Sequence, residues 1–204
     1  MEVPFLNKEE LLKKLNYRGI VLTPLLNKAF QQAQNTHQEQ KRDDGSPCLE
    51  QHIYPLISDL VDSFKGQNCP EKLLIAGLLH DVLEDDDATT EAEFIRSFGQ
   101  DVYDIVKPLT KERAENSPLL PEDRKREINA MMLEKISRAP KFSRLIKLAD
   151  RTNNLASIIT TKDVNPEKFK RYVIETKELY LPFAKKESDY YFNRLEQLLS
   201  EFSC

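Results

Sequence analysis

The sequence is poor in glycine, which weakens helices, and in cysteine, which can cross-link chains. It has 5 glycines and 3 cysteines in 204 residues, while Leu, Lys, Glu and Ala dominate long stretches. This composition favours an all-α chain. The cysteines (Cys48, Cys69 and Cys204) are widely spaced and odd in number, which indicates neither a disulfide framework nor a thiolate zinc site. We therefore expect an all-α protein in the cytoplasm.

Long hydrophobic runs are also missing. No apolar stretch approaches the roughly 20 residues that span a bilayer, and the N-terminal stretch MEVPFLNKEELLKKL lacks the apolar core of a signal peptide. We therefore expect no membrane association. The net charge of -4 argues against bulk attraction to nucleic acid, although it permits a local basic pocket. No repeat or Ser/Gly linker divides the chain, so a single domain over 1–204 is expected.

Apolar residues spaced three and four apart predict a succession of amphipathic helices. Thr90 and Glu93 form a capping-box pattern, and Gly99 predicts the end of that helix. Pro182 is expected to kink or break the helix that begins at Asn165-Pro166. The expected helices cover 7–16, 22–40, 50–65, Pro70 to Val82 or Glu84, 90–99, 101–109, 123–137, 142–159, a stretch from 166, and a last helix within 183–202, with a loop at 111–122.

One stretch, AGLLHDVLEDDDATTE (76–91), places charged pairs inside an apolar helical pattern. On a continuous helix, His80 and Asp81 would point about 100° apart and could share one ion, with Glu84 and Asp85 one turn later. The first pair could then ligate a metal, and the second could orient or deprotonate a metal-bound water. The alternative is a solvated acidic helix end, which the helix dipole disfavours.

A second stretch, IKLADRTNNLAS (146–157), places Lys147, Asp150 and Asn154 on one face of an apolar helix. A buried carboxylate needs a partner or an ion. An intrahelical pair of Lys147 with Asp150 is one interpretation, and a metal site is the other. Together with His52 and the first stretch, Asp150 would complete a shell of two imidazoles and two carboxylates. Such a shell suits Mn, Fe or Zn better than Ca.

The ordered series of motifs resembles the HD-domain phosphohydrolases, in particular the hydrolase domain of RelA/SpoT-type enzymes and the small Mesh1-like hydrolases. The resemblance covers roughly 25–185 and implies an HD-domain helical bundle. It also implies a metal-dependent hydrolase that removes the 3′-pyrophosphate from (p)ppGpp. The stretches that carry it are AFQQAQNTHQEQKRDDGSP, LLIAGLLHDVLEDDDATTEAEFIRSFG, IVKPLTKERAE, DRKREI, LIKLADRTNNL and ETKELYLPFA.

The resemblance implies a role for each matching residue. The implied ion is Mn²⁺, with another divalent transition metal possible, and the implied metal ligands are His52, His80, Asp81 and Asp150. The implied catalytic pair is Glu84 and Asp85. The implied substrate-binding residues are Lys41, Arg42, Lys147, Asn154, Arg124, Lys125 and Arg126. His37 matches a family histidine that is not a ligand, and Asp86 and Asp87 are expected to form the turn before Thr90.

The position of His52 departs from the family spacing. Family members place this histidine four residues after the proline of a G-x-P-Y motif and directly before another proline. Here His52 stands five residues after Pro47, and Pro55 comes later still. A one-residue insertion before the helix would return His52 to the site, so we expect it to be a ligand.

Three functions follow from these patterns. The first is (p)ppGpp hydrolysis, the second is hydrolysis of another nucleotide such as NADPH, and the third is a metal-poor, non-catalytic nucleotide-binding regulatory domain. The shifted His52 is the only feature that favours the third. The expected partner is a small-molecule nucleotide, and the sequence does not predict the oligomeric state. Because the chain ends at 204, a bifunctional synthetase-hydrolase is not expected.

Overall fold

The computed structural model describes residues 5–111, 121–160 and 165–200. Within these ranges the regular structure is helical, and the only β-type pairing is an isolated bridge between Lys41 and Pro47. The predicted all-α fold is therefore confirmed. The described residues form two compact units, 5–110 and 111–200, which we call the N-terminal and C-terminal units.

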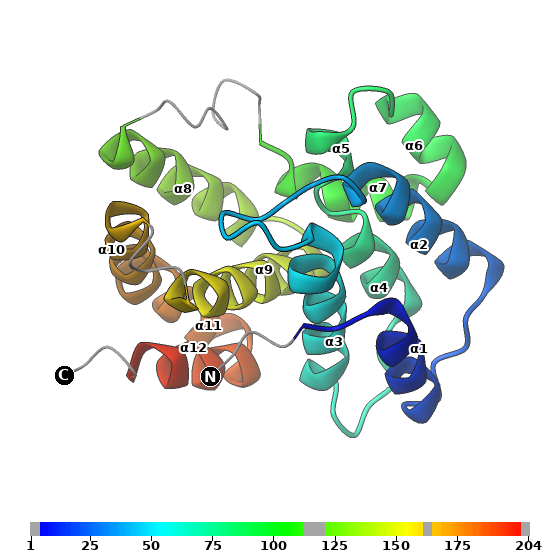
Figure 1. Cartoon of the computed structure of the whole chain (residues 1–204), viewed down its shortest axis with the longest axis horizontal. Coiled ribbons are helices and arrows are strands. Elements are labelled where there is room, and N and C mark those ends of the chain that lie inside the picture. Colours follow the sequence, from blue (N-terminus) through cyan, green and yellow to red (C-terminus); the bar gives the residue numbers. More distant parts are fainter. Residues whose placement is uncertain (1–4, 112–120, 161–164, 201–204) are drawn as a thin grey trace. The chain divides into compact units, whose positions relative to one another are not determined.

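The N-terminal unit contains seven α-helices among its described residues (Figure 1). They are α1 (Lys8–Tyr17), α2 (Pro24–His37), α3 (Tyr54–Ser63), α4 (Glu71–Leu78), α5 (Val82–Asp85), α6 (Glu91–Phe98) and α7 (Gln100–Val106). A π-helical segment (Leu49–Ile53) leads into α3, and a 3₁₀ turn (Lys107–Leu109) follows α7.

The helices of this unit begin where the sequence provides capping groups. The Asn7 side chain accepts the Glu10 N–H, while the Glu10 carboxylate accepts the Asn7 N–H. Thr90 and Glu93 form the same reciprocal pair at the start of α6, as predicted. Each pair satisfies backbone donors that a helix start leaves open. Gly99 then ends α6 with a φ of 87°, a conformation that disfavours residues with a Cβ.

Helices α3 and α4 pack closely in the core of the N-terminal unit. A Cβ atom at Gly77 would lie 2.8 Å from Leu60 Cδ1 and 2.9 Å from Ile57 Cδ1. Leu60 and Ile57 are fully buried, so they have little room to move away. The absence of a side chain at Gly77 therefore sets how near α4 can approach α3.

The predicted helix over 50–65 has an unusual first turn. The N–H of Tyr54 donates to the carbonyl of Leu49, five residues earlier, which makes Leu49–Ile53 a π-helical segment. Pro55 follows and has no N–H to donate. The Glu50 carbonyl, which Pro55 therefore cannot serve, accepts the N–H of Leu6 at 3.0 Å. This π-helical turn holds one residue more than an α-helical turn does, which agrees with the one-residue offset of His52.

The predicted continuous helix from Pro70 to Val82 or Glu84 is wrong in one respect. Helix α4 ends at Leu78, and α5 begins at Val82. Between them, the N–H of Val82 donates to the carbonyl of Leu79, three residues earlier. The apolar spacing continues across this break, so no local pattern indicated it. His80 and Asp81 consequently lie in a turn and not on one helical face.

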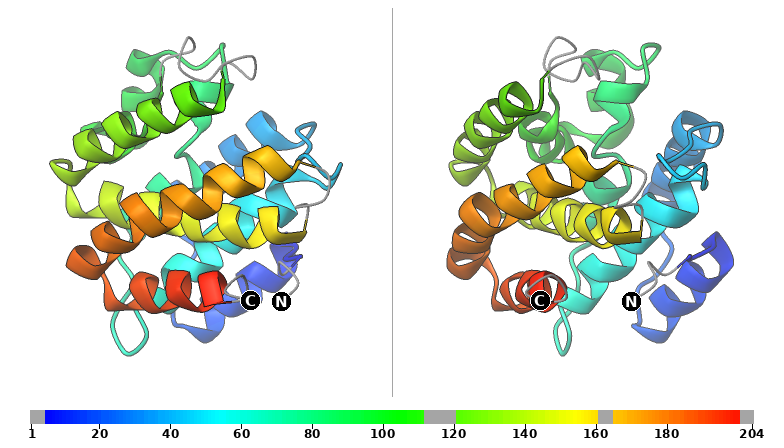
Figure 2. Two further views of the ribbon diagram at one scale, coloured as in Figure 1. Left: turned by 90° about the vertical axis from the view of Figure 1, so that its left-hand side faces the viewer. Right: turned by 60° about the vertical axis from the view of Figure 1, so that its left-hand side comes forward.

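The C-terminal unit is built around α9. Its helices are α8 (Glu122–Ser137), α9 (Lys141–Thr160), α10 (Pro166–Glu175), α11 (Leu181–Glu187) and α12 (Asp189–Ser200), with a π-helical segment (Thr176–Tyr180) before α11. Figure 2 shows α8, α10 and α12 arranged around α9, and each of them contacts it. Pro182 follows the π-helical segment as Pro55 follows Leu49–Ile53, and helical structure continues through it from Pro166 to Glu187, so the predicted kink or break at Pro182 stays a prediction.

A buried ion cluster joins α9 to α10 within the C-terminal unit. The Arg151 guanidinium donates to the Glu175 carboxylate at 2.9 Å and to the Thr176 hydroxyl at 2.9 Å. It also lies over the rings of Tyr172 and Tyr180, with centroid distances of 4.2 and 4.4 Å. Glu175 is fully buried, so this pairing satisfies a charge that would otherwise destabilise the core.

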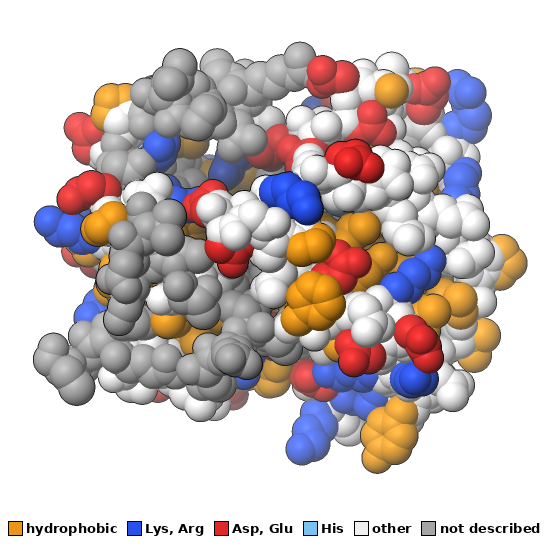
Figure 3. Space-filling model, viewed as in Figure 1, with side chains coloured by type: hydrophobic (Ala, Val, Ile, Leu, Met, Phe, Trp, Pro, Cys, Tyr) orange, Lys and Arg blue, Asp and Glu red, His pale blue; other side chains and the backbone are white. Residues whose placement is uncertain are grey.

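The surface carries charged residues of both signs, as the composition leads one to expect. Lysines, arginines and acidic residues are interspersed on the face of the N-terminal unit that Figure 3 shows. In the part of the chain that the structure describes, no helix has the length and apolar character needed to cross a bilayer. Most of the predicted loop 111–122, and the end of the predicted last helix beyond Ser200, lie outside the described residues.

Candidate metal centre

Three of the residues that the sequence analysis assigned as metal ligands converge in the N-terminal unit. One potential ligand atom from each of His52, His80 and Asp81 lies within 4.8 Å of the other two. His80 Nε2 is 3.0 Å and His52 Nε2 is 3.9 Å from Asp81 Oδ2. Both imidazoles are 3% exposed, so the donor atoms are shielded from bulk water.

The hydrogen bonding of His80 bears on whether this cluster fits a metal ion. Its Nδ1 lies 2.8 Å from the Gly77 carbonyl, which can only accept, so Nδ1 carries a proton. In the neutral ring, Nε2 then presents a lone pair to the Asp81 carboxylate oxygen. Two lone pairs at 3.0 Å repel unless a proton or a cation lies between them. The donor set therefore fits a divalent cation, and the Gly77 carbonyl orients the ligand for it.

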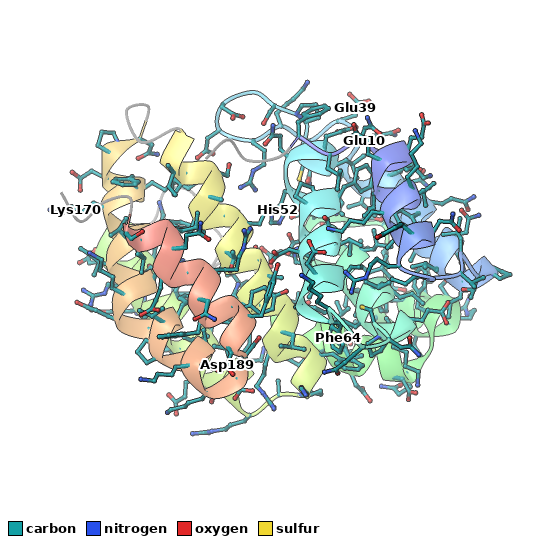
Figure 4. All side chains as sticks on the ribbon, turned by 90° about the horizontal axis from the view of Figure 1, so that it is seen from below. Glu10, Glu39, His52, Phe64, Lys170 and Asp189 are labelled. Atoms are coloured by element: carbon teal, nitrogen blue, oxygen red, sulfur yellow. The ribbon has the colours of Figure 1, made fainter. Side chains whose placement is uncertain are left out.

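Two local irregularities of the backbone bring these side chains together. The turn at Leu79–Asp81 directs His80 and Asp81 to the same place, although they are adjacent in sequence. The π-helical segment carries His52 at the start of the helix that continues as α3 (Figure 4). The His52 and His80 rings lie 5.4 Å apart, so the one-residue offset of His52 does not remove it from the cluster.

The electrostatics of the cluster favour an ionised Asp81. Burial acts to raise the pKa of Asp81, but the positive charges that His80 and His52 carry when they are protonated, together with the His80 hydrogen bond, outweigh it. The pKa of Asp81 is therefore held below its ordinary value. An ionised carboxylate is the form that binds a cation.

The predicted catalytic pair lies one short helix further along the chain. Glu84 and Asp85 end α5, and both their N–H groups donate to the carbonyl of Asp81, at 3.0 and 2.9 Å. The pair is thus tied through the backbone to a candidate ligand. Burial, followed by the charge of Asp81, raises the pKa of Asp85, while the hydrogen bond from Gln40 partly opposes the shift.

The expected basic residues of the N-terminal unit, Lys41 and Arg42, lie on a tight hairpin after α2. The Arg42 N–H donates to the carbonyl of Ser46, and the Gly45 N–H donates to the carbonyl of Arg42. Gly45 has a φ of 82°, which this turn requires. Lys41 is exposed and Arg42 partly exposed, so both guanidinium and ammonium groups reach solvent.

The other predicted site residues belong to the C-terminal unit. Lys147 Nζ lies 2.9 Å from Asp150 Oδ2, and Asn154 donates to Asp150 Oδ1. The intrahelical pair that the sequence left as an alternative is therefore present. Arg124 pairs with Glu127 and Arg126 with Glu178, on the exposed side of α8. Roles in the site for Asp150, Lys147, Asn154 and the 124–126 segment, including Lys125, stay predictions.

Some polar residues around the acidic turn were not predicted from the sequence. Gln32 donates to Asp86 and Thr89, and Gln40, three residues beyond the end of α2, donates to Asp85 at 3.2 Å, so these two glutamines hold the segment 85–89. Asp86 also accepts the Ala88 N–H, which confirms that it belongs to the turn before Thr90. No local pattern indicated Gln40, because its contact to Asp85 spans 45 positions.

Comparisons with known proteins extend this description. The chain is 34% identical over 164 residues to a probable guanosine-3′,5′-bis(diphosphate) 3′-pyrophosphohydrolase of Mycoplasma pneumoniae, covering 78% of this chain and 21% of that protein. It is 32% identical over 169 residues to a protein of Aquifex aeolicus named guanosine-3′,5′-bis(diphosphate) 3′-pyrophosphohydrolase, and 31% identical over 165 residues to a GTP pyrophosphokinase of Myxococcus xanthus. The matches cover 79% of this chain in both cases, with 21% of the Aquifex protein and 20% of the Myxococcus protein. The chain thus spans about a fifth of the length of these relatives.

A solved structure has the same fold. It is described as a metazoan ortholog of SpoT that hydrolyzes ppGpp, and it superposes with a TM-score of 0.70 over 89% of this chain and 97% of that one, at 24% identity. The HD domain family model matches residues 29–188, which is most of the chain and includes the candidate ligands of both units. The chain therefore belongs to the HD domain family.

Proposed function

We propose that this protein is a metal-dependent nucleotide phosphohydrolase that removes the 3′-pyrophosphate from (p)ppGpp, releasing GDP or GTP and pyrophosphate. The convergence of His52, His80 and Asp81, with Glu84 and Asp85 one short helix away, carries the proposal. The names of the Mycoplasma and Aquifex relatives support the substrate. The family model spans parts of both compact units, which supports one HD-type hydrolase domain over the chain.

The proposed ion is Mn²⁺. Two imidazole nitrogens and a carboxylate oxygen form a donor set that suits Mn, Fe or Zn and disfavours Ca. Asp150 is the proposed fourth ligand, on the basis of the family resemblance. When bound, such an ion polarises a phosphate oxygen and lowers the pKa of a water molecule toward neutrality. His80 would keep its Nδ1 proton on Gly77 and offer Nε2.

Glu84 and Asp85 would accept the proton of the attacking water molecule. Glu84 and Asp85 are proposed to orient the attacking water and take up its proton as the phosphorus–oxygen bond breaks. The raised pKa of Asp85 makes its carboxylate a better base than an ordinary aspartate. Both carboxylates are at least partly accessible, so a substrate phosphate can reach them.

Cations are needed because the substrate is a polyanion. Lys41 and Arg42 are proposed to neutralise its phosphates from the hairpin after α2. Lys147, Asn154 and the basic segment at Arg124, Lys125 and Arg126 are proposed to contribute from the C-terminal unit. Lys147 already pairs with Asp150, so we expect its phosphate contact to compete with that pair.

The test is product analysis with ppGpp and, separately, NADPH in Mn²⁺, comparing the wild-type protein with Asp81→Ala and Glu84→Ala. We expect wild type to release pyrophosphate from ppGpp and both variants to be at least about 100-fold slower. Turnover of NADPH alone would contradict the substrate assignment. Absence of bound transition metal in the purified protein, together with no turnover, would indicate a non-catalytic nucleotide-binding domain.

A further inference from the structure

A buried histidine and a glutamine contact the proposed base from outside the metal cluster. His37 is fully buried at the end of α2, and its Nδ1 lies 2.7 Å from Gln40 Oε1. Gln40 Nε2 donates in turn to Asp85 Oδ2 at 3.2 Å. His37 Nδ1 itself is 3.8 Å from the same oxygen, beyond hydrogen-bond distance. The three side chains therefore form a linear series, with Gln40 in the middle.

The proton positions in this series follow from the chemistry of its last member. An ionised carboxylate can only accept hydrogen bonds, so Gln40 must present its NH₂ group to Asp85. The amide oxygen of Gln40 then faces His37 and can only accept. His37 must therefore carry its proton on Nδ1. Its Nε2 is buried and has no hydrogen-bond partner among the described residues, which agrees with a neutral ring with a bare Nε2.

The backbone holds Gln40 firmly in this place. Its N–H donates to the carbonyl of His37 at 3.1 Å, and its carbonyl accepts the N–H of Cys48 at 3.0 Å. Gln40 is therefore anchored on one side to the end of α2 and on the other to the hairpin that carries Lys41 and Arg42. Only the side-chain torsions remain, and the His37 hydrogen bond restrains them.

The bond from Gln40 occupies only one oxygen of Asp85. Within residues 5–111, 121–160 and 165–200, the hydrogen bond made to this carboxylate is at Oδ2, and Oδ1 has none. The Asp85 side chain is 28% exposed. Holding Oδ2 fixes the plane of the carboxylate and leaves Oδ1 to accept a proton from a water molecule.

We propose that His37 and Gln40 are positioning residues that orient the Asp85 carboxylate for proton transfer, with His37 in the neutral Nδ1–H form. The inference depends on the role of Asp85 in the proposed function. His37, which the family resemblance marks only as a residue that is not a ligand, thereby acts on the reaction through Gln40. Neither residue belongs to the cluster of His52, His80 and Asp81.

The first test requires no turnover. Long-range ¹H–¹⁵N correlation spectra of the metal-free protein report which ring nitrogen of each histidine carries the proton. We expect His37 to be a neutral Nδ1–H tautomer at pH 7, and Gln40→Leu to change its tautomer balance because Nδ1–H loses its acceptor. An Nε2–H tautomer or an imidazolium at His37 in the wild-type protein would overturn the inference, whether or not the protein hydrolyses ppGpp.

The second test uses matched variants in Mn²⁺ with ppGpp. Gln40→Leu and His37→Leu should lower kcat by about 10-fold or more, with KM and metal content unchanged, because orientation of the base is lost. His37→Asn places an amide N–H close to the position of Nδ1 and should restore most of kcat. The exposed neighbour variant Gln38→Leu is the control and should match wild type.

These outcomes separate the inference from the proposed function. If wild type turns over ppGpp while Gln40→Leu keeps its full kcat, the positioning role is wrong and the proposed function stands. If His37→Asn is as slow as His37→Leu while both retain the thermal stability of wild type, the donor at Nδ1 is not what matters, and the role of His37 is wrong. If wild type is inactive on all nucleotides, the proposed function fails, and the tautomer measurement still decides the hydrogen-bonded series.

Discussion

His80 Nε2 lies 3.0 Å from Asp81 Oδ2, although the two residues are neighbours in a turn between two helices. The close approach depends on the break after Leu78, because adjacent residues on a regular helix diverge by about 100°. The turn thereby makes two sequence neighbours into two candidate ligands for one ion. The effects of substitutions in and around this turn should reveal how ligation, proton transfer and stability are divided among its residues.

Substitutions at Asp81 should affect metal binding, whereas substitutions at Glu84 should affect activity alone. Asp81→Asn should lower metal affinity because it removes a candidate ligand. The loss should exceed the roughly 10- to 100-fold that is typical when a residue hydrogen-bonded to a ligand is replaced. Glu84→Gln should keep its metal and lose about 10²- to 10⁴-fold in kcat. Elemental analysis of the purified variants and steady-state kinetics would measure both. Asp87→Asn is the control, and a metal-free Glu84→Gln would show that Glu84 belongs among the ligands.

The acid limb of the pH–rate profile should report on Asp85. Burial and the charge of Asp81 raise its pKa above the ordinary value of 3.8, while the hydrogen bond from Gln40 lowers it. A base works only when ionised, so kcat should fall as pH drops through this raised pKa. Gln40→Leu removes a hydrogen bond to the ionised form and should move the limb to higher pH. An unmoved limb would mean that another group titrates.

A side chain added at Gly77 should disturb the close packing of α3 against α4. Gly77→Ala should destabilise the protein by about 1–3 kcal/mol, because its Cβ would overlap the buried ends of Leu60 and Ile57. Metal affinity should fall too, since a displaced α4 would move the Gly77 carbonyl that accepts the His80 Nδ1–H hydrogen bond. Urea unfolding and metal titration would measure these effects. Ile57→Val should cost less in the Gly77→Ala background than alone, and simple additivity would rule out the predicted overlap.

The buried ion cluster of the C-terminal unit should contribute more to the free energy of unfolding than the exposed ion pairs do. Arg151→Met should cost about 3 kcal/mol or more, because Glu175 would keep a buried charge with fewer partners. Arg124→Met removes the exposed pair with Glu127 and should cost less than about 1 kcal/mol. Denaturant midpoints at constant m would compare them. Equal costs would mean that burial does not distinguish the two pairs.

The sequence predicted the helices better than their interruptions. Capping residues such as Thr90 and Asn165 and the apolar spacing placed most helices within a few residues of their observed bounds. The break after Leu78 was missed because the apolar spacing continues through it. The cluster of Arg151 and Glu175 was missed because the two residues are 24 positions apart, and no local pattern joins them.

Only part of the candidate site could be predicted, because local motifs identify residues that are close in sequence but not contacts between distant segments. Local motifs identified His80, Asp81, Glu84 and Asp85 together. The offset at His52 could be noticed but not resolved, because a π-helical turn leaves no periodic signature in the side chains. Gln40 escaped prediction because its contact to Asp85 spans 45 positions and joins a hairpin to a separate helix.

The π-helical turn before Pro55 also has a consequence for changes in chain length. Its hydrogen bond joins Tyr54 to Leu49, five residues earlier, so this turn holds one residue more than an α-helical turn does. We expect a residue gained or lost within Leu49–Ile53 to be taken up by the winding of this turn, with the residues of α3 keeping their register. The length of the chain before His52 could then vary without moving its imidazole away from His80 and Asp81.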